Sequence, residues 1–149
     1  MLVCKGTPEP MSPKSISPEV VRSEVTRFWD AFSAKDAERL QEFYAHESVG
    51  FGSSSTRSEP GRLAATRRKR EYFNSSGPIR TQLSPIEVVL LDEGAAVASY
   101  TFEFHAERFS LTSGKSEEHI RNGRATQVFA FDPDGKIRIF HEHFSVPGN

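Results

Sequence analysis

The chain has 149 residues, a length that folds as one domain around a single hydrophobic core. Its 19 lysines and arginines nearly balance 20 aspartates and glutamates, so no global field favours nucleic acid or an anionic membrane. The single cysteine, Cys4, excludes a disulfide within the chain and a cluster of thiolate metal ligands. No apolar run reaches the roughly 18 residues of a membrane span, and the first residues lack the apolar core of a signal peptide. We therefore expect a cytoplasmic protein.

Residues 1–17 are expected to form a flexible tail, because prolines interrupt a segment with few side chains to bury. Ser17 can then cap a helix that has Pro18 at its first position. The apolar residues that follow recur at helical spacing and predict one buried stripe: Val21, Val25, Phe28 and Phe32. The pattern predicts an amphipathic helix that ends near residue 34.

A second, shorter helix is predicted directly after the first. Asp36 can cap it, and Leu40, Phe43 and Tyr44 are expected to face inward from it. The short junction between the two helices predicts a tight helical hairpin. A brief strand over residues 48–51 is expected to follow.

A polar loop over residues 52–56 separates this strand from a third helix, predicted over residues 58–74 because Ser58–Pro60 has the pattern of a helix start. An inward stripe is predicted on it: Leu63, Thr66, Arg70 and Phe73. The helix and its approach also carry a cluster of basic residues, a feature of some nucleic-acid-binding helices. Because the chain as a whole is slightly acidic, we expect a solvated face with one or two arginines near a pocket mouth.

After Pro78 the period of the apolar residues changes from helical to extended. Four long strands are predicted, over residues 79–91, 95–109, 118–131 and 136–145. Pro85, inside the first of them, predicts an edge position or a bulge. Tight-turn sequences join these strands into an antiparallel meander, and long strands twist and coil. The sequence therefore predicts the α+β class, with a curved antiparallel sheet packed on three helices.

Two parts of the chain resemble a known family. Residues 28–45, with FWDAFSAKDAERL followed by FYA, resemble the helical hairpin of SnoaL-like proteins, which belong to the nuclear transport factor 2-like superfamily. GRATQVF at 123–129 and IFHEHFS at 139–145 resemble the final hairpin of that group and of the calmodulin-dependent protein kinase II association domain. The resemblance covers residues 18–147. It implies a cone-shaped cystatin-like roll, capped by helices, with a pocket inside and commonly a homodimeric assembly.

The final turn allows the two faces of the last hairpin to be assigned. Residues 132–135, Asp-Pro-Asp-Gly, predict a three-residue hairpin loop. Alternation then places four pairs on one face: Phe131 with Ile137, Phe129 with Ile139, Gln127 with His141, and Ala125 with His143. This face has an apolar floor and a polar end, as a small-molecule pocket needs. A bulge would exchange the two faces.

On this assignment, His141 and His143 are candidates for general acid–base catalysis, because an imidazole titrates near neutral pH. Gln127 and Phe129 on the same face are candidate substrate-binding residues. Alternatively, both histidines are hydrogen-bonded groups of the core or of an interface.

A second candidate pair, Glu103 and His105, shares one face of the strand over 95–109. The carboxylate could orient the imidazole, which makes His105 a third catalytic candidate and Glu103 a binding candidate. A solvated outer face is the alternative. Either residue could also complete a metal site with His141 and His143, whose side chains point the same way from one strand. No metal and no cofactor are expected.

Three further side chains are candidates for binding substrate. Tyr44 could donate to a developing oxyanion, Trp29 could form an aromatic wall, and Arg124 could hold an anionic group. Alternatively, Arg124 pairs with Glu142, which alternation places on the same face of the last hairpin, opposite to the histidines. Asp30 lies off the apolar stripe and is expected in solvent.

The resemblance implies a protein of the isomerase, dehydratase or cyclase type that acts without a cofactor on a small hydrophobic or weakly polar molecule. A non-catalytic association module is the alternative, because fold does not settle function, and a histidine-based metal site is a second one. Apolar residues on both faces of the sheet predict a homodimer through the outer face of the meander. No nucleic acid and no membrane partner are expected.

Overall fold

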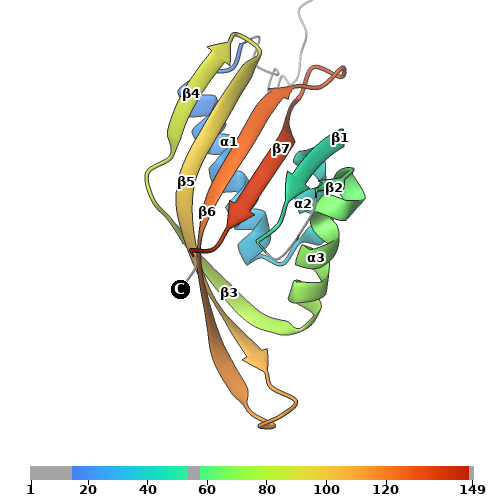
Figure 1. The fold of residues 1–149 in the computed structure, drawn as a ribbon, viewed down its shortest axis with the longest axis vertical. Coiled ribbons are helices and arrows are strands. Elements are labelled where there is room, and N and C mark those ends of the chain that lie inside the picture. The colour runs from blue at the N-terminus through green and yellow to red at the C-terminus, as the bar shows by residue number, and fades with distance from the viewer. Residues whose placement is uncertain (1–14, 54–57, 148–149) are drawn as a thin grey trace, which may run out of the picture.

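The computed structural model describes residues 15–53 and 58–147 (Figure 1). In this part of the chain the helices are α1 (Pro18–Ser33), α2 (Ala37–Glu42) and α3 (Arg62–Asn74). The strands are β1 (Tyr44–Phe51), β2 (Glu59–Pro60), β3 (Ser76–Leu83), β4 (Glu87–Asp92), β5 (Ala95–Phe109), β6 (Ser116–Phe131) and β7 (Ile137–Ser145). The helices precede the long strands, which confirms the predicted α+β class. No helix in the described ranges is long and apolar enough to cross a membrane.

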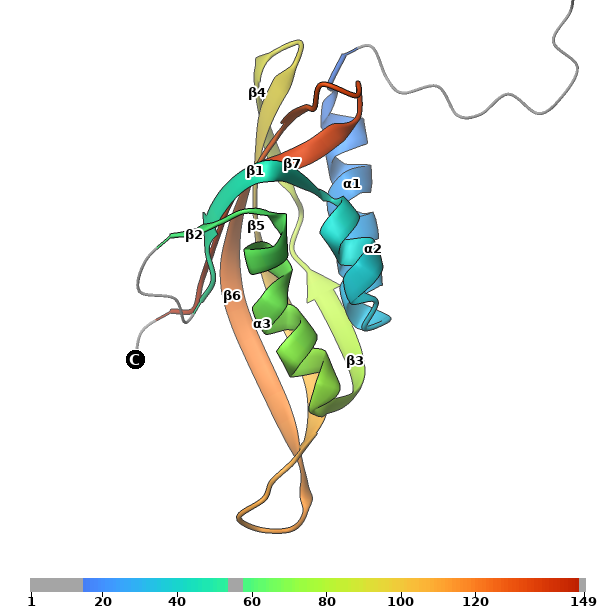
Figure 2. The ribbon, with the colours of Figure 1, turned by 90° about the vertical axis from the view of Figure 1, so that its right-hand side faces the viewer.

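These strands form one sheet in the order β2-β1-β7-β6-β5-β3, with β4 paired to β5 as well. The pairing of β1 with β7 is parallel and the other pairings are antiparallel. The sheet curves around the helices, which lie on its concave side, and the end of the β5–β6 hairpin extends beyond them as an arm (Figure 2). No helix of residues 15–53 or 58–147 lies on the outer face of the sheet (Figure 1).

The first helix begins and packs as predicted. Ser17 Oγ accepts a hydrogen bond of 3.2 Å from the N–H of Val20, and Pro18 occupies the first turn. The predicted apolar stripe is buried, and Trp29 is buried beside it. The stripe therefore fixes which face of α1 meets the sheet.

The packed part of the chain begins before this helix. Ile16 is buried in the core, and its N–H donates a 2.8 Å hydrogen bond to the carbonyl of Glu93. The end of the expected tail is thus anchored to the β4–β5 turn. Residues 1–14 of that tail, and positions 54–57 of the predicted polar loop and helix approach, lie outside the described residues.

The concave face of the sheet pairs large residues with small ones. Across β5 and β6, Phe102 lies opposite Gly123 and Tyr100 opposite Ala125. A Cβ on Gly123 would lie 2.3 Å from Phe102 Cζ, so glycine leaves the room that this ring occupies. Trp29 stacks on the ring of Phe102 with centroids 4.8 Å apart. The result is an aromatic wall between α1 and the sheet.

The third helix begins later than predicted. Glu59–Pro60 pairs with β1 as a short strand instead of opening the helix. Gly61 then turns the chain with a φ of 92°, a conformation that glycine adopts without strain, and its N–H donates to the carbonyl of Ser48. The helix starts only at Arg62 because strand pairing holds the residues before it.

The predicted inward stripe of this helix is also partly wrong. Thr66 and Phe73 are buried as expected, but Leu63 is 70% exposed. Lys69, rather than Arg70, reaches into the interior, with its side chain 14% exposed. The inner face of α3 is therefore rotated by about one residue and presents a cation.

The predicted strand over 79–91 is two strands, β3 and β4, which pair with successive parts of β5. Ser84 stays attached between them, because its N–H donates to the carbonyl of Thr101 and its Oγ accepts from the N–H of Thr101. Pro85 has no N–H to offer to a ladder. Its place beside the break, at the edge of the sheet, agrees with the predicted edge position or bulge.

The final hairpin has the predicted loop. The N–H of Asp132 donates to the carbonyl of Lys136, and Gly135 has a φ of 81°. The first predicted pairs, Phe131 with Ile137 and Phe129 with Ile139, are confirmed.

Beyond those pairs the predicted register is wrong. A β-bulge at Phe140 adds one residue to β7, so Gln127 lies opposite Glu142 instead of His141. Ala125 correspondingly lies opposite Phe144 instead of His143. One extra residue exchanges the two faces for the rest of the strand.

Candidate functional site

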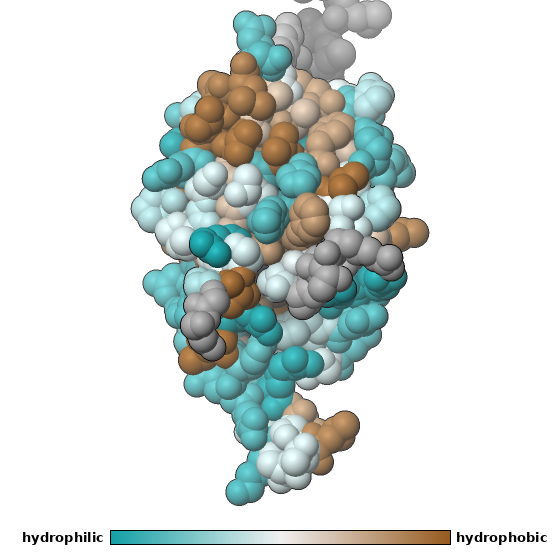
Figure 3. Space-filling model, viewed as in Figure 1, coloured by the Kyte–Doolittle hydropathy of each residue, from teal (hydrophilic) through white to brown (hydrophobic). Residues whose placement is uncertain are grey.

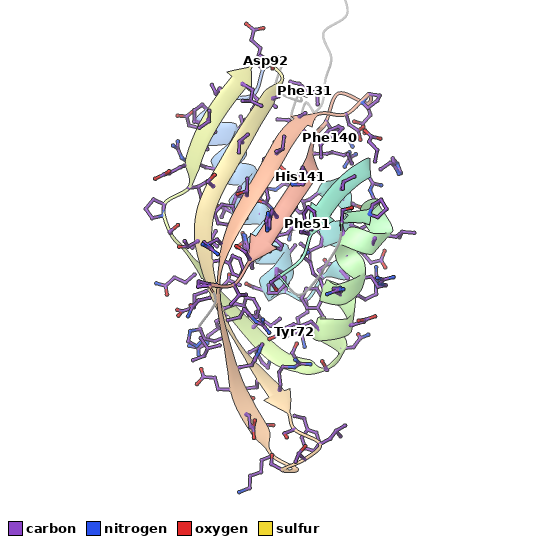
Figure 4. The ribbon with its side chains drawn as sticks, in the orientation of Figure 1. Phe51, Tyr72, Asp92, Phe131, Phe140 and His141 are labelled. Atoms are coloured by element: carbon purple, nitrogen blue, oxygen red, sulfur yellow. The ribbon has the colours of Figure 1, made fainter. Side chains whose placement is uncertain are left out.

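The bulge decides which side chains of β7 enter the concave side of the sheet. Glu142 and Phe144 point inward and are 6% and 8% exposed. His141 points to the outer face, where its ring lies 6.3 Å from the ring of Phe51 on β1 (Figure 4). His143 lies on the same face, with its ring 5.5 Å from that of Phe51. The structure therefore brings a carboxylate, and not the two histidines, into the interior.

Three side chains from three elements donate to the Glu142 carboxylate. The Tyr44 hydroxyl, at the start of β1, donates to Oε2 at 2.7 Å. The Gln127 amide, on β6, donates to Oε1 at 2.7 Å. The Lys69 ammonium, on α3, lies 3.4 Å from Oε2 and also over the ring of Phe144. Both oxygens of the buried carboxylate are thereby satisfied, as a buried charge requires.

A second layer of hydrogen bonds fixes the orientation of Gln127. Its Oε1 accepts from the Tyr100 hydroxyl at 2.7 Å, and the Tyr100 oxygen accepts from the Trp29 indole N–H at 2.9 Å. Because the amide oxygen is occupied by Tyr100, the amide nitrogen faces Glu142. The hydrogen bonds therefore run in one direction, from Trp29 through Tyr100 and Gln127 to the Glu142 carboxylate.

The two tyrosines of the network stay protonated at neutral pH. Burial raises the pKa of the Tyr44 hydroxyl well above its usual range, and the charge of the adjacent Glu142 raises it further. Burial likewise raises the pKa of Tyr100 well above its usual range. Both hydroxyls therefore act as neutral hydrogen-bond donors.

Two adjoining cavities lie along this network. The first is narrow, with a volume of about 40 Å³; it lies between β1 and α3 and has Tyr44, Lys69 and Glu142 in its wall. The second is larger, with a volume of about 190 Å³, and Trp29 lies in its largely aromatic wall. The cavities share three lining residues: Gly52, Arg68 and Lys69. Lys69 thus stands at the boundary between them.

The structure brings some of the predicted binding residues together. Tyr44 and Trp29 line the first and second cavity respectively, although Tyr44 begins β1 rather than ending the second helix. Gln127 belongs to the buried network. Phe129 is a core residue, 1% exposed, and lines neither cavity.

Arg124 is elsewhere, and its expected salt bridge with Glu142 is wrong. It lies exposed on the outer face, where Nε donates to Ser145 Oγ at 3.1 Å. Asp30 is exposed, as expected.

Glu103 and His105 share the outer face of β5, with Phe102 and Phe104 on the inner one, as the alternation predicts. The His105 ring lies 3.0 Å from a carboxylate oxygen of Glu118 and 3.3 Å from one of Glu103. Hydrogen bonds to Glu118 and then to Glu103 raise the pKa of His105. This pair lines neither cavity, and within the described ranges no group of three or more histidine, cysteine or acidic side chains could hold a metal ion.

Lys69 and Tyr100, which belong to the network around Glu142, were not predicted as site residues from the sequence. A signal existed for Lys69, because Thr66, Lys69 and Phe73 also lie at helical spacing. Glu142 was recognised as a charge among apolar strand residues that needs a partner, but its partner was misassigned. Alternation could not identify the right one because the bulge precedes it.

Residues 21–149 match the sequence profile of the SnoaL-like domain. The chain belongs to the SnoaL-like family. No curated protein matches the chain. Membership agrees with the geometry described above, in which a curved sheet and its helices enclose cavities on the concave side.

Solved structures show the same fold as this SnoaL-like domain. The association domain of calcium/calmodulin-dependent protein kinase II from Caenorhabditis elegans is 22% identical, with a TM-score of 0.64, over 86% of this chain and 93% of that one. A nuclear transport factor 2-like superfamily protein from Salmonella enterica is 21% identical, with a TM-score of 0.69, over 88% and 91%. An NTF2-like family protein from Streptomyces avermitilis, provisionally described as a dehydratase, is 18% identical, with a TM-score of 0.73, over 88% and 96%.

Proposed function

We propose that this SnoaL-like domain binds a small hydrophobic or weakly polar molecule and catalyses proton transfer on it without a cofactor, as in an isomerisation or a dehydration beside a carbonyl group. The supporting observation is the Glu142 carboxylate, buried at a cavity wall with Tyr44 and Lys69 beside it. A buried carboxylate next to a space for substrate is a common arrangement for a general base. The relative described as a dehydratase supports the reaction class.

In this proposal Glu142 accepts a proton from the carbon next to the substrate carbonyl. Its contact with Lys69 is 3.4 Å, longer than the 2.7 Å bonds from Tyr44 and Gln127, so it is the contact most easily exchanged. Lys69 can turn toward the substrate oxygen, where its charge stabilises the developing enolate. That movement also frees a lone pair on Glu142 Oε2 for the proton.

The test uses two panels of model substrates, β,γ-unsaturated ketones for isomerisation and β-hydroxy ketones for dehydration. Both reactions begin with the same proton abstraction and give a conjugated enone, which is measured by its ultraviolet absorbance. We expect the parent protein to convert members of at least one panel. Glu142→Gln should lower the rate at least about 100-fold, because general acid–base catalysis typically contributes that much.

His143→Gln is the matched comparison, because it changes the neighbouring residue on the outer face. We expect its rate to equal that of the parent. Loss of the rate in His143→Gln with full activity in Glu142→Gln would instead assign the catalysis to the histidines. The absence of any conversion by the folded parent would contradict the proposed reaction class.

A second candidate function is homodimeric association through the outer face of the sheet. One row of pairs across that face is mostly apolar, with Val89 opposite Val97 and Val97 opposite Val128. His141 follows on β7, and Val49 lies on its other side. Val89 and Val49 are 60% and 38% exposed. Apolar residues gather over the upper part of this face (Figure 3). A surface of this kind favours contact with a second copy of the chain.

We expect the parent protein to sediment as a dimer at tens of micromolar, a concentration roughly suited to an interface of standard size. Val128→Glu, at the centre of the row, should shift it to monomer, because it places a charge inside a dry contact. Leu63→Glu also replaces an apolar side chain by glutamate, but on the exposed side of α3, and this variant should remain a dimer. A parent that sediments as a monomer would contradict the association.

A further inference from the structure

The second cavity combines aromatic walls with cationic groups. Trp29, Phe102 and Phe104 contribute rings to its wall. Lys69 and Arg121 contribute positive charges, as does Arg68. None of the described residues in its lining is acidic. Aromatic rings and cationic side chains around one cavity indicate the kind of molecule that fits it.

Arg121 is the cation of this cavity that is best placed to bind an anion. It lies on β6 opposite Phe104, so it shares the concave face with the aromatic residues. Among the residues that the structure describes, it makes no ion pair with a carboxylate. Its side-chain contact is with His119 Nε2, 3.4 Å from Nη2. Lys69, in contrast, is already paired with Glu142.

The histidine that holds Arg121 is neutral. Burial lowers the pKa of His119, and the charges of Arg121 and Arg108 lower it further. A neutral imidazole can accept from Arg121 at Nε2 and donate from Nδ1 to the Tyr72 hydroxyl, which lies 2.7 Å away. The guanidinium is therefore positioned without being neutralised.

We propose that the second cavity binds an aromatic anion, with the ring against the Trp29–Phe102–Phe104 wall and a carboxylate on Arg121. This inference rests on the proposed small-molecule function and changes the expected ligand in one respect, because it adds an anionic group to an otherwise hydrophobic molecule. A guanidinium binds a carboxylate through two parallel hydrogen bonds, which a neutral group cannot match. The cavity volume of about 190 Å³ is smaller than that of most drug-binding cavities, so it suits a small aromatic molecule rather than a large one.

The test compares 2-naphthoate with 2-naphthamide, which have the same ring and nearly the same shape but differ in charge. Affinities are measured by calorimetry. Trp29 is the single tryptophan, so its indole N–H gives one NMR signal that reports occupancy of this cavity. We expect the parent to bind naphthoate at least about tenfold more tightly than naphthamide, the preference that one charge-assisted hydrogen bond gives.

Arg121→Gln should remove this preference and leave naphthamide binding unchanged. Arg124→Gln is the matched control, because it removes the same charge from the outer face of the same strand and should keep the preference. Equal binding of the two probes by the parent would overturn the inference. An equal loss of the naphthoate preference in Arg121→Gln and Arg124→Gln would overturn it as well. Neither result would contradict the proposed small-molecule pocket. If neither probe shifts the Trp29 signal at millimolar concentration, the inference and the small-molecule function both fail. Glu142→Gln should still bind naphthoate, so a loss of catalysis alone does not count against the inference.

Discussion

Replacement of Glu142 by leucine should lower the free energy of unfolding by about 3–5 kcal/mol, the usual cost of removing one partner from a buried ion pair. Leucine is similar in size, so the change creates little cavity. It leaves the Lys69 ammonium, the Gln127 amide and the Tyr44 hydroxyl without their acceptor in the interior. In a domain of this length, each kcal/mol lowers the melting temperature by about 2–4 °C. Thermal and urea unfolding followed by circular dichroism measure both quantities.

Removal of the cation as well should recover part of this loss. In the double variant Glu142→Leu with Lys69→Met, both charges of the buried pair are removed. Replacement of a buried ion pair by apolar groups often changes the free energy of unfolding very little. The remaining deficit should be about 1–3 kcal/mol, because Gln127 and Tyr44 still lack an acceptor. If Glu142→Leu melts at the temperature of the parent, the network is not buried in solution, and the site assignment is wrong.

Replacement of Gly50 by alanine should destabilise the domain and disturb the site together. Gly50 lies beside Glu142 in the parallel pairing of β1 and β7. A Cβ there would lie 2.5 Å from the backbone oxygen of Glu142, and a backbone atom cannot rotate away. The strands must separate, at a cost of about 1–3 kcal/mol. Unfolding measurements give the cost, and the rate with the model ketones should fall because Tyr44 and Glu142 belong to these two strands.

Gly77→Ala provides the control, because it makes the same exchange in another strand of the same sheet. The nearest atom to its Cβ would be Glu107 Cβ at 3.4 Å, an ordinary contact. With less backbone freedom lost on folding, this variant should be as stable as the parent or gain a few tenths of a kcal/mol. Equal stability of Gly50→Ala and Gly77→Ala would show that β1 and β7 are not held as closely as the structure has them.

Both expected losses originate in a few residues at the junction of β1, β7 and α3. The bulge at Phe140 turns Glu142 inward, the close approach at Gly50 holds β1 against it, and α3 supplies Lys69. None of these contacts is local in the sequence. A site made in this way depends on the register of two strand pairs and on the rotation of one helix.

The sequence by itself determined the parts of the fold that depend on neighbouring residues. Ser17 and Pro18 start α1, the spacing of its apolar residues selects its buried face, and residues 132–135 form the predicted hairpin loop. Alternation correctly placed Phe102 and Phe104 on one face of β5 and Glu103 on the other. These features follow from periodicity, capping and turn chemistry, which act within a few residues. The class of the fold follows from the order of such elements.

Only the tertiary structure decided which groups meet in the interior. The alternation of side chains between the two faces holds along a strand until a bulge adds one residue and reverses it. Nothing in the sequence around Phe140 marks the bulge. The same limit applies to α3, whose start is set by the pairing of β2 with β1 and whose inward cation is Lys69 rather than Arg70. Bulges and helix rotation respond to packing across the whole sheet. For that reason the predicted histidine face became the outer face, and the carboxylate assigned to the opposite face became the centre of the site.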